Sequence, residues 1–152
     1  SSWFTNNEWS AYGEWSGARG SDISGSRLVT FYEGSPSSSG SQIWFHDGLT
    51  STGNNFRGQR KGEYIFNMGP ADGNMDAGRI AVSLKDGDYQ YWYNGAYSSG
   101  ATGGTPIPVI DSMKLGAQGW ADTSGVLNGY VKKFAVYPVQ LPDATLEEMT
   151  KE

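Results

Sequence analysis

The sequence predicts an all-β fold, in which antiparallel strands form a two-sheet β-sandwich and one short helix follows at the C-terminal end. Three observations support this prediction. The 152 residues include 22 glycines and are 14% aromatic, which is typical of strands joined by tight turns. Turn signals recur about every 8–15 residues, and segments that alternate apolar with polar residues lie between them. Hairpin-joined strands bury their apolar faces when two sheets pack together, so a sandwich is expected.

Four strands are predicted in the first half of the chain. In the stretch EWSAYGEWSG, the residues Trp9, Ala11 and Trp15 fall on one face of an extended chain. The other three expected strands are RLVTFYEG (27–34), SQIWFHDG (41–48) and GEYIFNMG (62–69). Residues 49–62 carry many turn-forming residues and are expected to form a loop or an irregular hairpin.

Two turn signals organise the second half. Asp86-Gly87 is a two-residue hairpin turn between RIAVSLK and the aromatic stretch DYQYWY. Asn94-Gly95 is a second such signal, so the chain is expected to reverse again into AYSSG. The last two predicted strands are TPIPVIDSMKLGAQ (105–118), whose prolines suit a sheet edge, and YVKKFAVYP (130–138).

The only helical pattern lies at the C-terminal end. The stretch DATLEEMTKE consists largely of good helix formers and predicts a helix from about Asp143 to Lys151. Leu146 and Met149 are three residues apart, so they share a helix face that is expected to pack on the sandwich.

Composition excludes several classes of partner. The net charge is −5 and the 11 lysines and arginines are scattered, so neither nucleic acid nor an anionic membrane surface is an expected partner. There is no cysteine, hence no disulfide and no thiolate metal site. The length suits one domain over residues 1–152. The start lacks Met and a signal-peptide pattern, which predicts a domain excised from a longer protein.

The C-terminal half carries an ordered set of motifs. AGRIAVSLKDGDYQYWYNGA is followed by SMKLGAQ, VLNGYVKKFAVYP and LPDATLEEMT. This order, over residues 77–150, resembles the concanavalin A-like lectin/glucanase superfamily, and within it the LamG-like jelly rolls of phage and bacterial surface proteins. The resemblance implies a jelly-roll sandwich. Such domains often begin the last helix with a Ser or Thr cap, whereas Pro142 stands in that place here, so Asp143 is the candidate cap.

Catalytic patterns of related sandwiches are missing. The Glu-x-Asp-x-Glu strand of the glucanases does not occur, and neither does the Arg-x-Glu-x-Arg strand of the lyases. His46 is the only histidine and is interpreted as structural. We therefore expect no enzyme. The resemblance implies a non-catalytic, lectin-like carbohydrate-binding module, an attachment domain that meets glycans outside the cell or on a virion surface. Two alternatives stay open: a structural or protein-binding decoration domain that contacts other subunits of a tail, capsid or adhesin, and a polysaccharide hydrolase or lyase.

Aromatic residues with polar neighbours supply the candidate binding site. Trp120 lies in a predicted loop, and loop tryptophans are frequent binding anchors, with Asp122 and Asn128 as partners for sugar hydroxyls. The second choice is Trp92 with Asn94. In the stretch DYQYWYN, the tyrosines alternate with Gln, Trp and Asn, and the alternation leaves open which row faces outward.

One stretch has the spacing of a calcium loop. Asp72, Asn74 and Asp76 in DGNMD match the first half of an EF-hand loop. Ala77 replaces the glycine of the sharp turn and Ser83 replaces the bidentate glutamate, which excludes an EF-hand. A looser Ca²⁺ site is the alternative that the resemblance leaves open, beside a plain polar turn.

Overall fold

The computed structural model contains ten strands and one helix among the residues that it describes. These are residues 8–17, 27–34, 41–45, 56–60, 63–68, 77–98, 107, 109–117, 127 and 129–151. The elements are β1 (Glu8–Ser16), β2 (Val29–Tyr32), β3 (Gln42–Phe45), β4 (Phe56–Arg60), β5 (Glu63–Met68), β6 (Ala77–Lys85), β7 (Asp88–Tyr93), β8 (Ala96–Ser98), β9 (Ser112–Leu115), β10 (Tyr130–Tyr137) and α1 (Asp143–Thr150).

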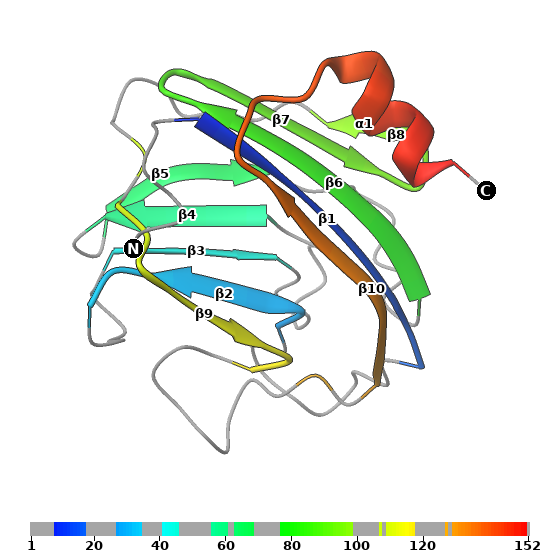
Figure 1. Ribbon diagram of the computed structural model, residues 1–152, viewed down its shortest axis with the longest axis horizontal. Helices are drawn as coiled ribbons and strands as arrows, with labels where there is room; N and C mark the ends of the chain where they lie inside the picture. Colours follow the sequence, from blue (N-terminus) through cyan, green and yellow to red (C-terminus); the bar gives the residue numbers. More distant parts are fainter. Residues whose placement is uncertain are drawn as a thin grey trace.

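The strands form two sheets that pack face to face (Figure 1). One sheet has the order β10-β1-β6-β7-β8 and carries α1 on its outer side; we call it the helix-bearing sheet. The other has the order β5-β4-β3-β2-β9, and we call it the opposite sheet. Every strand pair in both is antiparallel. The predicted all-β sandwich with a short C-terminal helix is confirmed.

Aromatic side chains fill the space between the sheets. Phe31 of the opposite sheet lies near the centre, with its ring centroid 5.0 Å from that of Trp9, 5.8 Å from that of Phe45 and 6.2 Å from that of Phe134. Trp9 and Phe134 come from the helix-bearing sheet, so the contacts cross the interior. Such aromatic contacts stabilise a core beyond the area they bury, by about 0.5–1.5 kcal/mol each.

The structure resolves the orientation of the aromatic strand β7. Its tyrosines, Tyr89, Tyr91 and Tyr93, are all buried in the core cluster. Trp92 therefore points to the outer side of the helix-bearing sheet, where it packs beneath α1. The tyrosine row is core, and only the other row is available to the outer surface.

Both predicted hairpin turns are present. Gly87 has a φ of 78° in the turn that joins β6 to β7, and Asn94 and Gly95 have φ values of 47° and 77° in the turn that joins β7 to β8. These left-handed conformations are easy for glycine and tolerated by asparagine, which is why the two dipeptides signal turns. The irregular-hairpin alternative for residues 49–62 is also confirmed in part, because β4 pairs with β5 through a register shift between Gly58 and Gln59.

The helix begins where it was predicted, but its cap differs. Pro142 occupies the cap position with an extended backbone and makes no side-chain cap bond, and Asp143 is the first helical residue. The prediction that Asp143 caps the helix was wrong, because an extended proline satisfies the cap position and leaves Asp143 in the first turn, where its charge favours the helix dipole. Leu146 is buried and Met149 packs beside it, as predicted.

No helix among the described residues is long and apolar enough to cross a membrane.

Replacing Gly78 with alanine should destabilise the protein. A Cβ at Gly78 would lie 2.8 Å from Trp15 Cζ2 and 2.8 Å from Tyr93 Cε2, and both rings are buried. We expect Gly78→Ala to lower the free energy of unfolding by about 1–3 kcal/mol, as overpacking does. Urea denaturation measures this, with Ala77→Ser on the exposed neighbouring position as the control. Equal stability of the two variants would contradict the tight packing.

Stability should also fall at high pH because of Tyr89. Burial, with the nearby Asp86 charge, raises the pKa of this phenol above its ordinary value of 10.0. The folded state then binds the proton more tightly than the unfolded state, so the stabilisation is complete below pH 10 and is lost as the pH rises through the folded pKa. Denaturation at several alkaline pH values measures the free energy of unfolding. It should fall less steeply with pH for Tyr89→Phe than for the parent, because the variant has no phenol to ionise at this position. Identical slopes for variant and parent would contradict the assignment.

Candidate functional site

A row of mostly polar residues crosses the outer face of the opposite sheet. The strand register pairs Asn67 with Arg57, Arg57 with Trp44, Trp44 with Thr30, and Thr30 with Lys114. These five residues, one on each strand of the sheet, are called the outer row below. Along their strands these positions alternate with core residues such as Phe31 and Ile43, so they belong to the outward face of the sheet. The Thr30 side chain is itself fully buried.

The outer row spans the full width of the sheet. Strands lie about 4.8 Å apart, so the row is about 19 Å wide and its two cationic positions, Arg57 and Lys114, are separated by about 14 Å. That separation is too great for both cations to hold one carboxylate. The arrangement instead offers separate polar contacts along an extended ligand.

One end of the outer row is fixed by a side-chain hydrogen bond. Arg57 Nε donates to Asn67 Oδ1 over 2.8 Å, which fixes the orientation of the guanidinium relative to the sheet. The bond also assigns the Asn67 amide, because its oxygen is the acceptor and its NH₂ group remains a donor on an exposed side chain. Two planar donor groups therefore lie side by side on adjacent strands.

The neighbouring row of the same face is polar as well. Tyr32 pairs with Gln42 on one side and with Ser112 on the other. Gln42 is buried and Tyr32 is partly exposed. The charged side chains described in these two rows are the cations Arg57 and Lys114, although the chain as a whole is acidic.

The outer row adjoins the base of the segment that carries Trp120 and Asp122. Thr30 Oγ1 donates to the carbonyl oxygen of Ala117 over 3.0 Å. The amide of Leu127 donates to the carbonyl oxygen of Gly116 over 2.7 Å, which brings the two ends of the segment together. Both ends of residues 118–126 are therefore held at the opposite sheet. Trp120, Asp122 and Asn128 themselves lie outside the described residues.

The second-choice pair lies on the other side of the sandwich. Trp92 is half-buried in a small cluster formed by Tyr12, Ala81 and Leu146 beneath α1, with the Tyr97 ring 5.3 Å from its own. Its side chain thus contributes to packing against the helix rather than standing on an open sheet surface. Asn94 is exposed in the β7–β8 turn. The structure does not bring this pair together with the outer row.

The predicted calcium residues Asp72, Asn74 and Asp76 lie outside the described residues, as does His46. In the part of the chain that the structure describes, no group of three or more His, Asp or Glu side chains is arranged to hold a metal ion.

Sequence reasoning did not identify the outer row. Arg57 falls in the segment that is expected to form a loop or an irregular hairpin, and Lys114 is one of the scattered charges of the chain. Arg57 and Lys114 come into one row because β2 pairs with both β3 and β9. That pairing depends on contacts between segments far apart in the sequence.

Comparison with known proteins gave structural relatives only. No protein-family model matches the chain, and no curated protein matches its sequence. The CBM40 of an intramolecular trans-sialidase from Ruminococcus gnavus, bound to α2,3-sialyllactose, is 15% identical, with a TM-score of 0.68 over 94% of this chain and 82% of that one. Domain 4 of the arabinanase AbnA from Geobacillus stearothermophilus, in complex with arabinotriose, is 12% identical, with a TM-score of 0.65 over 95% of this chain and 66% of that one.

A leech intramolecular trans-sialidase is also similar, with 12% identity and a TM-score of 0.68. The match covers 94% of this chain but only 23% of that enzyme. At such identities the likeness shows the fold, and it confirms the sandwich architecture.

Proposed function

We propose that the chain is a non-catalytic carbohydrate-binding module that binds an oligosaccharide across the outer face of the opposite sheet. The observation that carries this proposal is the outer row, in which the amide of Asn67, the guanidinium of Arg57 and the ammonium of Lys114 stand on one face of the sheet across its full width.

The chemistry of the outer row suits sugar hydroxyls. Sugars are recognised by a small number of placed polar groups beside apolar surface, and planar side chains such as amides and guanidinium groups give directional hydrogen bonds. Because Arg57 and Lys114 are about 14 Å apart, the contacts match several linked sugar rings better than a single one. Two structural relatives support this size class, since one is bound to sialyllactose and the other to arabinotriose.

We propose that Trp120, Asp122 and Asn128 complete the site. The described residues Ala117 and Leu127 that flank positions 118–126 are held next to Thr30 of the outer row. From there Trp120 would stack on a sugar ring, and Asp122 and Asn128 would accept or donate hydrogen bonds to its hydroxyls. A loop anchor beside a rigid sheet is a common arrangement of binding sites.

The setting proposed for this binding is the surface of a phage or a bacterial protein, outside the cell or on the virion. The ordered motifs of residues 77–150 support that setting, since they resemble LamG-like domains of such proteins.

Removing either cation of the outer row should weaken glycan binding. A glycan array, run with and without calcium, first identifies the ligand, and calorimetry then measures its affinity. Hydrogen bonds to charged groups contribute about 1.5–3 kcal/mol, so Arg57→Ala and Lys114→Ala should each weaken binding about tenfold or more. Lys85→Ala, an exposed cation on the helix-bearing sheet, is the matched control and should bind like the parent. Unchanged affinity of both outer-row variants would reject this face, and release of reducing ends from the ligand would reject the non-catalytic assignment.

Trp120→Ala should weaken binding of the same glycan roughly tenfold, because stacking on one aromatic ring contributes about 1 kcal/mol or slightly more. The melting temperature should be nearly unchanged, since a tryptophan that stacks on a ligand is not needed for the core. A variant that melts early but still binds would identify Trp120 as a packing residue instead.

A further inference from the structure

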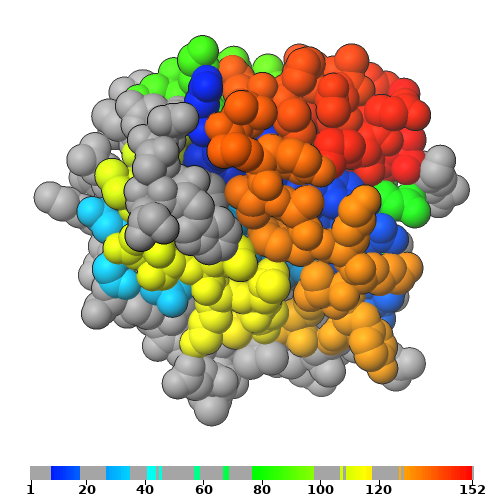
Figure 2. Space-filling model, in the orientation of Figure 1, coloured from blue at the N-terminus to red at the C-terminus, as the bar shows by residue number. Residues whose placement is uncertain are grey.

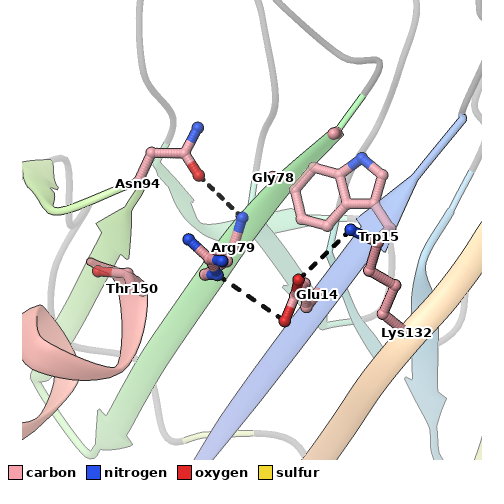
Figure 3. Close-up of a pocket in the computed structure, with 8 residues that line it drawn as sticks. Glu14, Trp15, Gly78, Arg79, Asn94, Lys132 and Thr150 are labelled. Atoms are coloured by element: carbon pink, nitrogen blue, oxygen red, sulfur yellow. Dashed lines mark hydrogen bonds and ion pairs between the residues drawn. The ribbon is translucent and has the colours of Figure 1, made fainter. Parts of the chain in front are cut away.

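A pocket of about 360 Å³ lies on the outer face of the helix-bearing sheet, on the other side of the sandwich from the outer row (Figure 3). Four elements and one turn contribute polar side chains to it. They are Glu14 of β1, Arg79 of β6, Lys132 of β10, Thr150 of α1 and Asn94 of the β7–β8 turn. The volume is at the lower end of the range for small-molecule sites and suits a ligand the size of one sugar ring.

Two cations share a single carboxylate in this pocket. Arg79 Nε lies 3.7 Å from Glu14 Oε2, and Lys132 Nζ lies 3.6 Å from Glu14 Oε1. These separations are longer than a direct hydrogen bond. Arg79 Nη1 donates to the carbonyl oxygen of Lys151 over 3.4 Å, so the Lys132 ammonium and the remaining guanidinium donors keep capacity for a further acceptor. Tyr12 donates to Glu14 Oε2 over 3.2 Å, and burial together with the Glu14 charge raises the pKa of this phenol, which keeps it protonated. The pocket therefore carries one net positive charge in an acidic protein.

The remaining polar groups are mainly donors. Asn94 Oδ1 accepts from the backbone amide of Arg79 over 2.9 Å, so the NH₂ group of this side chain points away from Arg79, as Figure 3 shows. Thr150 Oγ1 accepts from Gly95 N over 3.1 Å and lies 2.9 Å from the carbonyl oxygen of Glu147, to which it can donate. The Thr150 hydroxyl thus makes its hydrogen bonds within the protein, and the side chain only lines the pocket. The groups left for a ligand are the guanidinium, the ammonium and the amide NH₂.

An exposed aromatic ring lies on the same face. Tyr130 pairs with Ser16, which stands two residues beyond Glu14 on β1 and therefore faces the same way, about 7 Å along the strand. The Tyr130 ring lies beside Gly17, since a Cβ added to this glycine would be 3.5 Å from Tyr130 Cδ2. Tyr130 is 75% exposed. Strand β10 is at the edge of its sheet and reaches the surface beside α1 (Figure 2).

We propose that this pocket is a second binding site, separate from the outer row, for a sugar that carries one carboxylate. The carboxylate lies between Arg79 and Lys132, the Asn94 amide donates to a ring hydroxyl, and the ring contacts Tyr130. One carboxylate neutralises the single net positive charge of the pocket, whereas a dianion would leave one negative charge uncompensated beside the Glu14 carboxylate. A planar carboxylate also matches the fork of donors that a guanidinium presents.

The test is an NMR titration of the whole chain at low salt with D-glucuronate and N-acetylneuraminate, against D-glucose as the uncharged comparison and inorganic phosphate as a dianion. The acidic sugars should bind at least several-fold more tightly than glucose and phosphate, and added salt should weaken their binding. Shifts of the Arg79, Asn94 and Lys132 amides should report the site. Equal affinity for glucose, tighter binding of phosphate, or no binding of either acidic sugar at about 50 mM would overturn the proposal.

Three charge variants sharpen the test because they should act in opposite directions. Lys132→Gln should weaken binding of the acidic sugars about fivefold, whereas Glu14→Gln should strengthen it several-fold by removing the competing carboxylate. Lys85→Gln, an exposed cation elsewhere on the same sheet, should change nothing beyond the small effect of net charge. Thermal melts show that each variant is folded. Unchanged binding in Lys132→Gln, or weaker binding in Glu14→Gln, would overturn the assignment to this pocket.

Discussion

The fold depends on how bulky aromatic rings are accommodated between the two sheets. Trp15 and Tyr93 lie with ring centroids 6.1 Å apart, and the backbone of Gly78 on the strand between them comes so close that there is no room for a side chain. At the other part of the core, Trp9 and Phe134 contact Phe31 from across the interior. Because these rings must face inward, the register of β1, β6 and β7 is fixed, since a shift by one residue would turn every ring outward.

The residues that must face the core determine which residues face outward, and the positions of both candidate sites follow from this. On the helix-bearing sheet, the positions between core residues bring Glu14 and Arg79 to the outer face as cross-strand neighbours. On the opposite sheet, the same alternation brings Thr30 and Arg57 to the outer row. Interior packing thus fixes the positions of these outward-facing groups, and such preorganisation lowers the entropic cost of binding a ligand.

The sequence predicted the features that are encoded locally. Asp86-Gly87 and Asn94-Gly95 identified their turns because left-handed backbone is costly for most other residues, and the C-terminal helix followed from its composition. Features that depend on pairing between distant segments were not predictable. Neither the inward direction of the β7 tyrosines nor the alignment of Arg57 with Lys114 has a local signal, since alternation has the same pattern whichever face is buried. The cap at Pro142 has no side-chain signal, because proline has no polar side-chain group that could bond the first amides of the helix.

Two hydrogen bonds hold Ala117 and Leu127, the described residues on either side of positions 118–126, at the opposite sheet. Leu127 belongs to the core, so the chain between Ala117 and Leu127 starts and ends at fixed points on the sandwich. Closing a loop becomes only slowly more costly with length, about 0.6 kcal/mol for each doubling. Residues 118–126 are therefore a place where evolution or an engineer can exchange one recognition sequence for another, longer or shorter, while the scaffold stays as it is.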